Sequence, residues 1–168
     1  QTHIDGNNKT ITNFAPEAFV GDDQTTAATY PSLFGVLYGS CKNLTIKDSK
    51  IIATATTPSC GFLGGYVGTS GKPALVENVH IEGEISGGSC LGGFGGQSRE
   101  GTFKNCTSKV KITSGGTDVG GFIGKTAVST HLENCTAEVE LVPTEAVSGN
   151  LRYAGIVGYT TGNSMKVI

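Results

Sequence analysis

The sequence carries little charge and has no long apolar run. Charged residues account for 15% of its 168 positions, well below the usual quarter. The 12 basic and 14 acidic residues nearly cancel, so we expect no broad basic surface and no nucleic-acid partner. No apolar segment approaches the ~20 residues of a membrane-spanning helix, and no signal peptide is recognisable. At this length the chain corresponds to about one domain.

Cysteine pairs of the metal-binding kind and helical periodicity are also missing. The five cysteines, at positions 41, 60, 90, 106 and 135, form no C-x-x-C pair, so we expect no metal and no cofactor. Their number is odd, which leaves at least one thiol free. No segment has a convincing helical period. We therefore expect an all-β chain in which the cysteines act as small buried hydrophobes.

Glycine is abundant and recurs in a repeated motif. The 26 glycines include those of six-residue copies that begin at residues 34, 63, 91, 119 and 153, with a period of about 28 residues. A fixed period of this size is typical of stacked supersecondary units. The copies read "FGVLYG", "LGGYVG", "LGGFGG", "VGGFIG" and "YAGIVG".

One copy, extended to "VGGFIGKT" at residues 119–126, superficially matches a phosphate-binding loop. That loop needs four residues between its glycines and a helix after its Lys-[Ser/Thr] pair. Here three residues separate Gly120 from Gly124, and the following "AVSTHLENCTAEV" does not have a helical pattern. We interpret the segment as a repeat element.

Each copy continues into a strand that starts at an asparagine. After Asn78, Asn105 and Asn134 apolar residues alternate with polar ones, the pattern of a half-buried strand. Charge at the outward positions changes sign from copy to copy, which predicts parallel strands stacked in register about 4.8 Å apart. The two charged rows are Lys47, Glu82, Lys109 and Glu138 and, if "KDSK" holds one extra residue, Lys50, Glu84, Lys111 and Glu140.

The repeated asparagines predict a ladder at one corner of the stack. A turn residue present in every coil can hydrogen-bond its side-chain amide to the copies above and below. Three of these asparagines also match the N-x-T glycosylation acceptor, but a ladder asparagine has no room for a glycan. The predicted structural ladder consists of Asn43, Asn78, Asn105 and Asn134.

The two halves together resemble the GLUG motif, a bacterial repeat of the form φ-G-G-φ-φ-G, spacer, φ-x-N-C-x-x-x-φ. "VGGFIG…LENCTAEV" and "LGGFGG…FKNCTSKV" match it closely, whereas Leu44 and Val79 replace the cysteine in the earlier copies. The resemblance implies a right-handed parallel β-helix, a β-solenoid here of roughly five to six coils. We expect one domain, with a lead-in coil and insert at 1–33, repeat coils at 34–62, 63–90, 91–118 and 119–152, and a truncated last coil at 153–168.

The resemblance also implies a secreted or surface-anchored bacterial protein. Such repeats accompany adhesins and some large peptidases, usually as a non-catalytic region. We therefore expect a structural or adhesive module rather than an enzyme, with a glycan or a host surface protein as its partner. The first and last coils look open, so the chain is expected to be part of a larger protein or to associate end to end through unpaired strand edges.

An apolar stripe is the candidate binding site. The glycine-rich strand is apolar on both faces, and such a strand is normally covered on both. The inserts at 15–32 and 142–152 are candidates for this cover. If instead the larger column faces outward, it exposes aromatic rings to a partner or to flat sugar faces. The candidate ligand-binding residues are then Tyr66, Phe94 and Phe122.

The alternative function is that of the substrate-binding β-helix of a carbohydrate-active enzyme, a polysaccharide lyase or hydrolase. Glycosidases use two carboxyl groups ~5–9.5 Å apart, and Glu82 with Glu84, or Glu138 with Glu140, would share a face. Lysines in neighbouring coils would keep these carboxylates ionised and unsuited to act as a general acid. We therefore assign no catalytic residue, and nothing supports calcium at the acidic pair 22–23.

Overall fold

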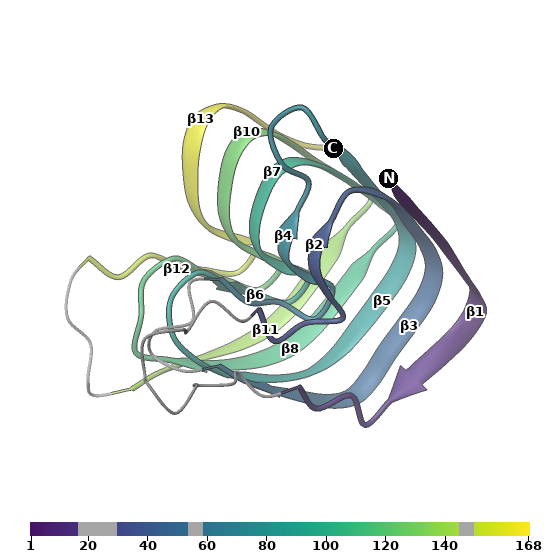
Figure 1. Cartoon of the computed structure of the whole chain (residues 1–168). Coiled ribbons are helices and arrows are strands. Elements are labelled where there is room, and N and C mark those ends of the chain that lie inside the picture. Colours follow the sequence, from purple (N-terminus) through teal and green to yellow (C-terminus); the bar gives the residue numbers. More distant parts are fainter. Residues whose placement is uncertain (17–29, 54–58, 145–149) are drawn as a thin grey trace, which may run out of the picture.

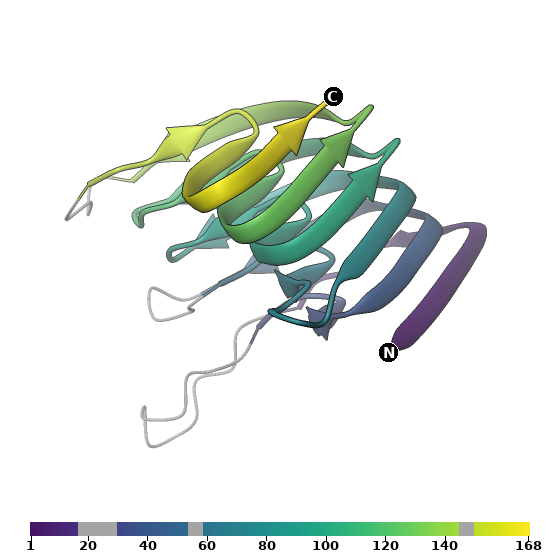
Figure 2. The same ribbon diagram turned by 90° about the horizontal axis from the view of Figure 1, so that it is seen from above.

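The computed structural model describes residues 1–16, 30–53, 59–144 and 150–168. Within these ranges the chain is all-β, contains no helix, and forms a parallel β-solenoid of about 4 turns. Figures 1 and 2 show the coils stacked from β1 at one end to β13 at the other. The all-β solenoid expected from the repeats is confirmed. Much of the two predicted covering inserts, and the acidic pair 22–23, lie outside the described residues.

One parallel ladder runs the length of the solenoid in the order β1-β3-β5-β7-β10-β13. Its register places Cys41 beside Val76, Val76 beside Phe103 and Phe103 beside Leu132. These four side chains are buried, so equivalent positions of successive coils form one continuous row of the core. The strands of this ladder are β1 (Thr2–Thr12), β3 (Gly39–Ile52), β5 (Ala74–Gly87), β7 (Gly95–Lys104), β10 (Ile123–Glu133) and β13 (Val157–Val167).

The chain turns a corner at the repeated asparagine. Asn43, Asn78, Asn105 and Asn134 have φ values of 53°, 53°, 53° and 51°, in the left-handed region that asparagine tolerates better than most residues. In the first two coils the strand continues through the corner, so β5 pairs with β7 before it and with β8 after it. In the next two coils a new strand begins beyond it, β8 (Thr107–Ser114) and β11 (Thr136–Pro143).

Beyond this corner the predicted alternation of apolar and charged residues is confirmed. The inward residues Val79, Ile81 and Ile85 of β5 are at most 2% exposed. In β3 the register shifts between Ile46 and Ser49, which accounts for the extra residue suspected in "KDSK". One outward row aligns Lys50 with Glu84, Glu84 with Lys111 and Lys111 with Glu140. The other aligns Glu82 with Lys109 and Lys109 with Glu138. Lys47, expected beside Glu82, falls within the register shift instead.

The glycine motif forms a second corner instead of a straight strand. The short strand before the bend ends at Gly92 in β6, and β7 begins at Gly95. The bend at residues 93–94 turns both Leu91 and Phe94 into the core, which explains why the motif is apolar at positions that a straight strand would place on opposite faces. The strands of this region are β2 (Phe34–Leu37), β4 (Gly64–Val67), β6 (Leu91–Gly92), β9 (Val119–Gly120) and β12 (Tyr153–Ala154).

The hypothesis that Tyr66, Phe94 and Phe122 share one outward column is wrong. The Leu63 amide donates to the Phe94 carbonyl, and the Phe94 amide donates to that of Phe122, so Leu63 shares the row of the two phenylalanines. Tyr66 is instead paired with Gln97. In this coil the motif can be aligned from Cys60, as "CGFLGG", or from Leu63, as "LGGYVG". In the structure Cys60 pairs with Leu91, so the copy starts at Cys60 and Leu63 is buried in the position equivalent to Phe94.

Phe94 and Phe122 belong to the core, where no ligand can reach them. They are 0% and 1% exposed, and their rings stack with centroids 4.2 Å apart. Phe103 packs edge-on against both, at 5.7 Å from Phe94 and 5.3 Å from Phe122. The edge-on geometry of Phe103 is favourable for aromatic pairs.

Core volume is also balanced between opposite walls of the solenoid. The Phe62 amide donates to the Gly93 carbonyl, so Phe62 occupies a position that is glycine in the next coil. On the opposite wall Gly83 is paired with Val110. A Cβ on Gly83 would lie 2.5 Å from Phe62 Cζ, so this glycine leaves the space that the Phe62 ring fills.

Candidate binding surface

An outward row crosses the sheet that follows the glycine corner. Tyr66 of β4 has Val36 of β2 on one side and Gln97 of β7 on the other. The row continues through Lys125 of β10 to Tyr159 of β13. We call Val36, Tyr66, Gln97, Lys125 and Tyr159 the Tyr66 row. Val36 is exposed and the other four side chains are half-buried, so the row lines an accessible face.

Cations lie against the tyrosine rings of this face. The Arg99 guanidinium lies 5.7 Å from the centroid of the Tyr66 ring, and Tyr30 meets that ring edge-on at 5.6 Å. At the other end, Arg152 and Lys125 lie 3.8 Å and 5.6 Å from the centroid of Tyr159. Cation–π contacts of this kind hold long basic side chains close to the rings. Partial burial, with Tyr30 next to it, raises the pKa of the Tyr66 phenol, which keeps the hydroxyl protonated.

An ion pair with a buried carboxylate anchors one of these cations. Arg152 Nε donates a hydrogen bond to Asp118 Oδ1, and Asp118 is 3% exposed. Asp118 has a φ of 61° and stands immediately before the glycine motif of its coil. The hydrogen bond holds the guanidinium in position over Tyr159, so that the ring and the charge are presented together.

The five thiols do not form a reactive centre. Burial raises the pKa of Cys41 to about 11, of Cys60 to about 12 and of Cys90 to about 11. Cys106, in the core, has its pKa raised by its contact with Cys135 and by burial. The same contact lowers the pKa of Cys135, which is half-buried immediately before β11. Because the thiolate is the nucleophile, Cys135, which is half-buried, is the thiol that reacts first in the folded state.

We expect iodoacetamide at pH 7.5 to modify Cys135 first, the half-buried Cys90 more slowly, and the buried Cys41, Cys60 and Cys106 only when the chain unfolds. Mass spectrometry of tryptic peptides after timed exposure, with and without urea, would measure this order. Equal labelling of Cys60 and Cys135 under native conditions would contradict the burial described above.

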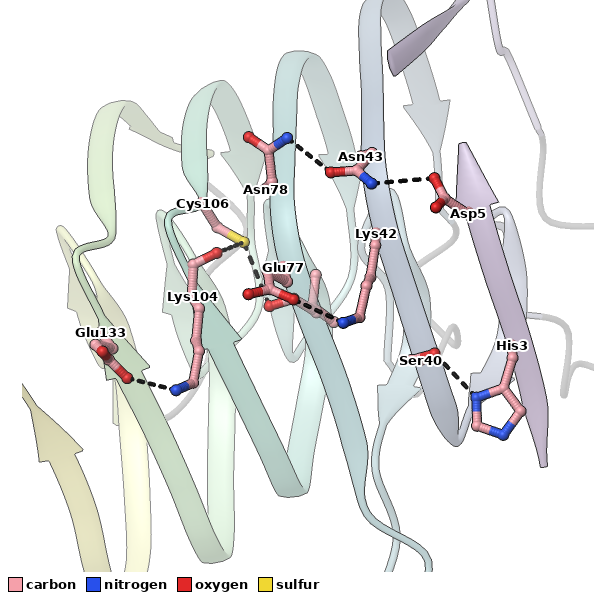
Figure 3. A network of polar contacts seen from close by, with 11 residues as sticks. His3, Asp5, Ser40, Lys42, Asn43, Glu77, Asn78, Lys104, Cys106 and Glu133 are labelled. Atoms are coloured by element: carbon pink, nitrogen blue, oxygen red, sulfur yellow. Dashed lines mark hydrogen bonds and ion pairs between the residues drawn. The ribbon is translucent and has the colours of Figure 1, made fainter. Parts of the chain in front are cut away.

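The asparagine corner carries a polar network (Figure 3). The Asn78 side chain donates to Asn43 Oδ1 at 2.9 Å, and Asn43 donates to Asp5 Oδ1 at 3.1 Å. One step further along the stack, Asn134 donates to Asn105 Oδ1 at 3.4 Å. The asparagine amides therefore link Asn43 to Asn78 and Asn105 to Asn134. The predicted ladder is interrupted between Asn78 and Asn105.

A third charged row, which the sequence analysis missed, precedes the asparagines. Register aligns Asp5, Lys42, Glu77, Lys104 and Glu133 in alternating sign. The Lys42–Glu77 and Lys104–Glu133 ion pairs measure 2.8 Å and 2.9 Å. Each of these residues stands immediately before its repeat asparagine, apart from Asp5 in the lead-in coil, so the alternation was readable in the alignment.

The carboxylates weighed as catalytic pairs lie in a groove of about 750 Å³ on the face beyond the asparagines. Each faces a lysine of a neighbouring strand, with Lys109–Glu138 at 3.5 Å and Lys111–Glu140 at 2.8 Å. His80, in the same sheet, is hydrogen-bonded to Thr107 Oγ1 and Asn78 Oδ1. In the part of the chain that the structure describes, no three His, Cys, Asp or Glu side chains gather as metal ligands would, and no helix is long and apolar enough to cross a membrane.

The chain was compared with known families, curated proteins and solved structures. The family model that matches is that of the GLUG motif, over residues 87–113. These residues span β6, β7 and most of β8, which is about one complete coil with both corners. No curated protein and no solved structure matches the chain. The chain is a β-solenoid repeat protein that carries the GLUG motif.

Proposed function

We propose that the chain is a non-catalytic structural and adhesive module of a secreted or surface-exposed bacterial protein. In this proposal the solenoid winds right-handed through roughly five to six coils, counting the incomplete ones at its ends. Its work is to hold a binding face at a distance and to contact a glycan or a host surface. The observation that carries the proposal is the Tyr66 row with the cations beside it.

The chemistry of this face favours an acidic glycan. Tyrosine rings offer flat apolar surface to the faces of sugars, and a polar edge to their hydroxyl groups. The neighbouring Arg99 and Lys125 supply positive charge for carboxylate or sulfate groups, whereas Arg152 is paired with Asp118. Two acidic side chains near them are already engaged, Asp118 by Arg152 and Glu100 by the Gly71 amide. Positive charge therefore remains available to a ligand.

The test is a glycan-array screen of the purified chain, followed by titration calorimetry with the glycans that bind. We expect sulfated or uronic-acid glycans to bind, and Tyr66→Ala and Lys125→Ala to weaken binding about tenfold each, which is the loss of one aromatic or one charge-assisted contact. Raising the salt concentration should weaken binding by the wild type more than by Lys125→Ala.

The matched control is Lys109→Ala, which removes an exposed lysine from the opposite charged face and should leave affinity unchanged. If Lys109→Ala and Lys125→Ala lose the same amount of affinity, the Tyr66 row is not the binding site. If the chain releases reducing ends from a bound polysaccharide and Glu138→Gln abolishes this activity, the chain is a carbohydrate-active enzyme and the proposal of a non-catalytic module is wrong.

A further inference from the structure

Three successive coils each place one basic side chain on the face that carries the Tyr66 row. Lys72 follows β4, Arg99 belongs to β7 and Lys125 belongs to β10. These strands are neighbours in one sheet (Figure 1). No ion pair between described residues includes any of the three. Lys72 and Arg99 are exposed and Lys125 is half-buried, so the face presents positive charge to an anionic ligand.

Arg99 and Lys125 flank a strip of this face. Lys125 is a member of the Tyr66 row and is aligned with Gln97 of β7. Arg99 lies two residues further along β7, and residues two apart in a strand point to the same face. The two cations therefore stand on neighbouring coils but at opposite edges of the strip, with the Tyr66 ring on the preceding coil.

The distance between coils decides which kind of polyanion matches these charges. Parallel strands stack about 4.8 Å apart, whereas an extended peptide brings side chains to one side only every ~6.7 Å. An extended β-1,4-linked pyranose chain advances by nearly the coil distance per sugar, and its successive sugars turn their substituents to opposite edges. Such a glycan can lie along the solenoid axis with one sugar over each coil.

We propose that the ligand of the Tyr66 row is a β-1,4-linked polyuronate, a glycan with a carboxylate on every sugar, bound along the solenoid axis. Arg99 and Lys125 bind the carboxylates of two successive sugars from opposite edges. The Tyr66 ring packs against the adjacent sugar. This inference rests on the proposed function, because it specifies the acidic glycan that the same face binds.

Two oligosaccharides of equal charge separate this arrangement from a general attraction of acidic glycans. A β-1,4-mannuronate tetramer carries four carboxylates on successive sugars, whereas a hyaluronan octamer carries four on every second sugar. A tetraglutamate peptide with blocked ends is the polypeptide control. Their affinities for the intact chain would be measured by titration calorimetry at low and high salt, with the wild type, Arg99→Ala, Arg99→Lys and Lys109→Ala.

We expect the wild type to bind the mannuronate tetramer about tenfold more tightly than the hyaluronan octamer at low salt, because only mannuronate brings carboxylates to Arg99 and Lys125 together. Arg99→Ala should abolish this preference, and Arg99→Lys should restore most of it. Lys109→Ala, on the opposite charged face, should leave it unchanged. Raised salt should reduce it.

Each of the other results would overturn the inference. If the wild type binds the two oligosaccharides equally, or if the preference survives in Arg99→Ala, the inference is wrong and the proposed glycan-binding function stands. Tighter binding of the peptide than of the mannuronate tetramer would assign the face to an acidic polypeptide. Absence of binding by any acidic glycan would overturn the inference and the proposed function together.

Discussion

Phe94→Ala is expected to lower the free energy of unfolding by about 3–5 kcal/mol, the usual cost of removing a buried aromatic ring. The ring is fully buried and contacts the rings of both Phe122 and Phe103. Its loss leaves a cavity between adjacent coils that the backbone ladder holds apart and prevents from closing. Urea denaturation followed by circular dichroism would measure the change.

Tyr66→Ala is the matched control, because sequence analysis placed this residue in the same column. Tyr66 is half-buried and contacts Tyr30 and Arg99 at the surface, so its removal should cost at most about 1 kcal/mol. A loss for Tyr66→Ala as large as that for Phe94→Ala would show that the Tyr66 row is part of the core.

Gly121→Ala and Gly155→Ala are expected to differ strongly although they occupy the same position in successive coils. A Cβ on Gly121 would overlap the Gly155 carbonyl oxygen and lie 2.9 Å from Val139 Cβ. Relieving that overlap requires the backbone of the next coil to move, so we expect a loss of about 1–3 kcal/mol, typical of overpacking. A Cβ on Gly155 meets no atom within 4 Å.

The comparison is made by thermal unfolding of the two variants beside the wild type. Gly155→Ala should be neutral or slightly stabilising, because alanine restricts the unfolded chain and its site is open. A stable Gly121→Ala variant would mean that adjacent coils are not in the close contact described here.

The fold could be predicted from the sequence because several independent features of the repeat indicate it. Alternating apolar residues after each asparagine predicted the inward row, and sign alternation from Lys109 to Glu138 predicted parallel strands in register. Both are consequences of backbone geometry and depend on no distant contact. The register shift between Ile46 and Ser49 could also be predicted, because "KDSK" holds one residue more than the equivalent segment of the other copies.

The candidate site was harder to predict, because glycine pairs mark a bend without fixing its frame. "CGFLGG" can be aligned from Cys60 or from Leu63, and a shift of three residues moves an aromatic side chain from one wall to another. Only packing decides between the frames, since it buries Leu63 beside Phe94 and leaves Tyr66 outside. Arg152 could not be assigned to Tyr159 from the sequence either, because Asp118 holds it there from the preceding coil.

Because charge alternates along the rows, it matters whether the number of coils changes by an odd or an even number. If one coil, for example the one that contains β8, were removed as a unit, carboxylates would meet carboxylates in every row. Glu82 would then stand beside Glu138, Glu84 beside Glu140, and Glu77 beside Glu133. Like charges directly opposite one another are destabilising, whereas removing or inserting two coils restores every pair. Such a protein can change its length without electrostatic cost only in even numbers of coils.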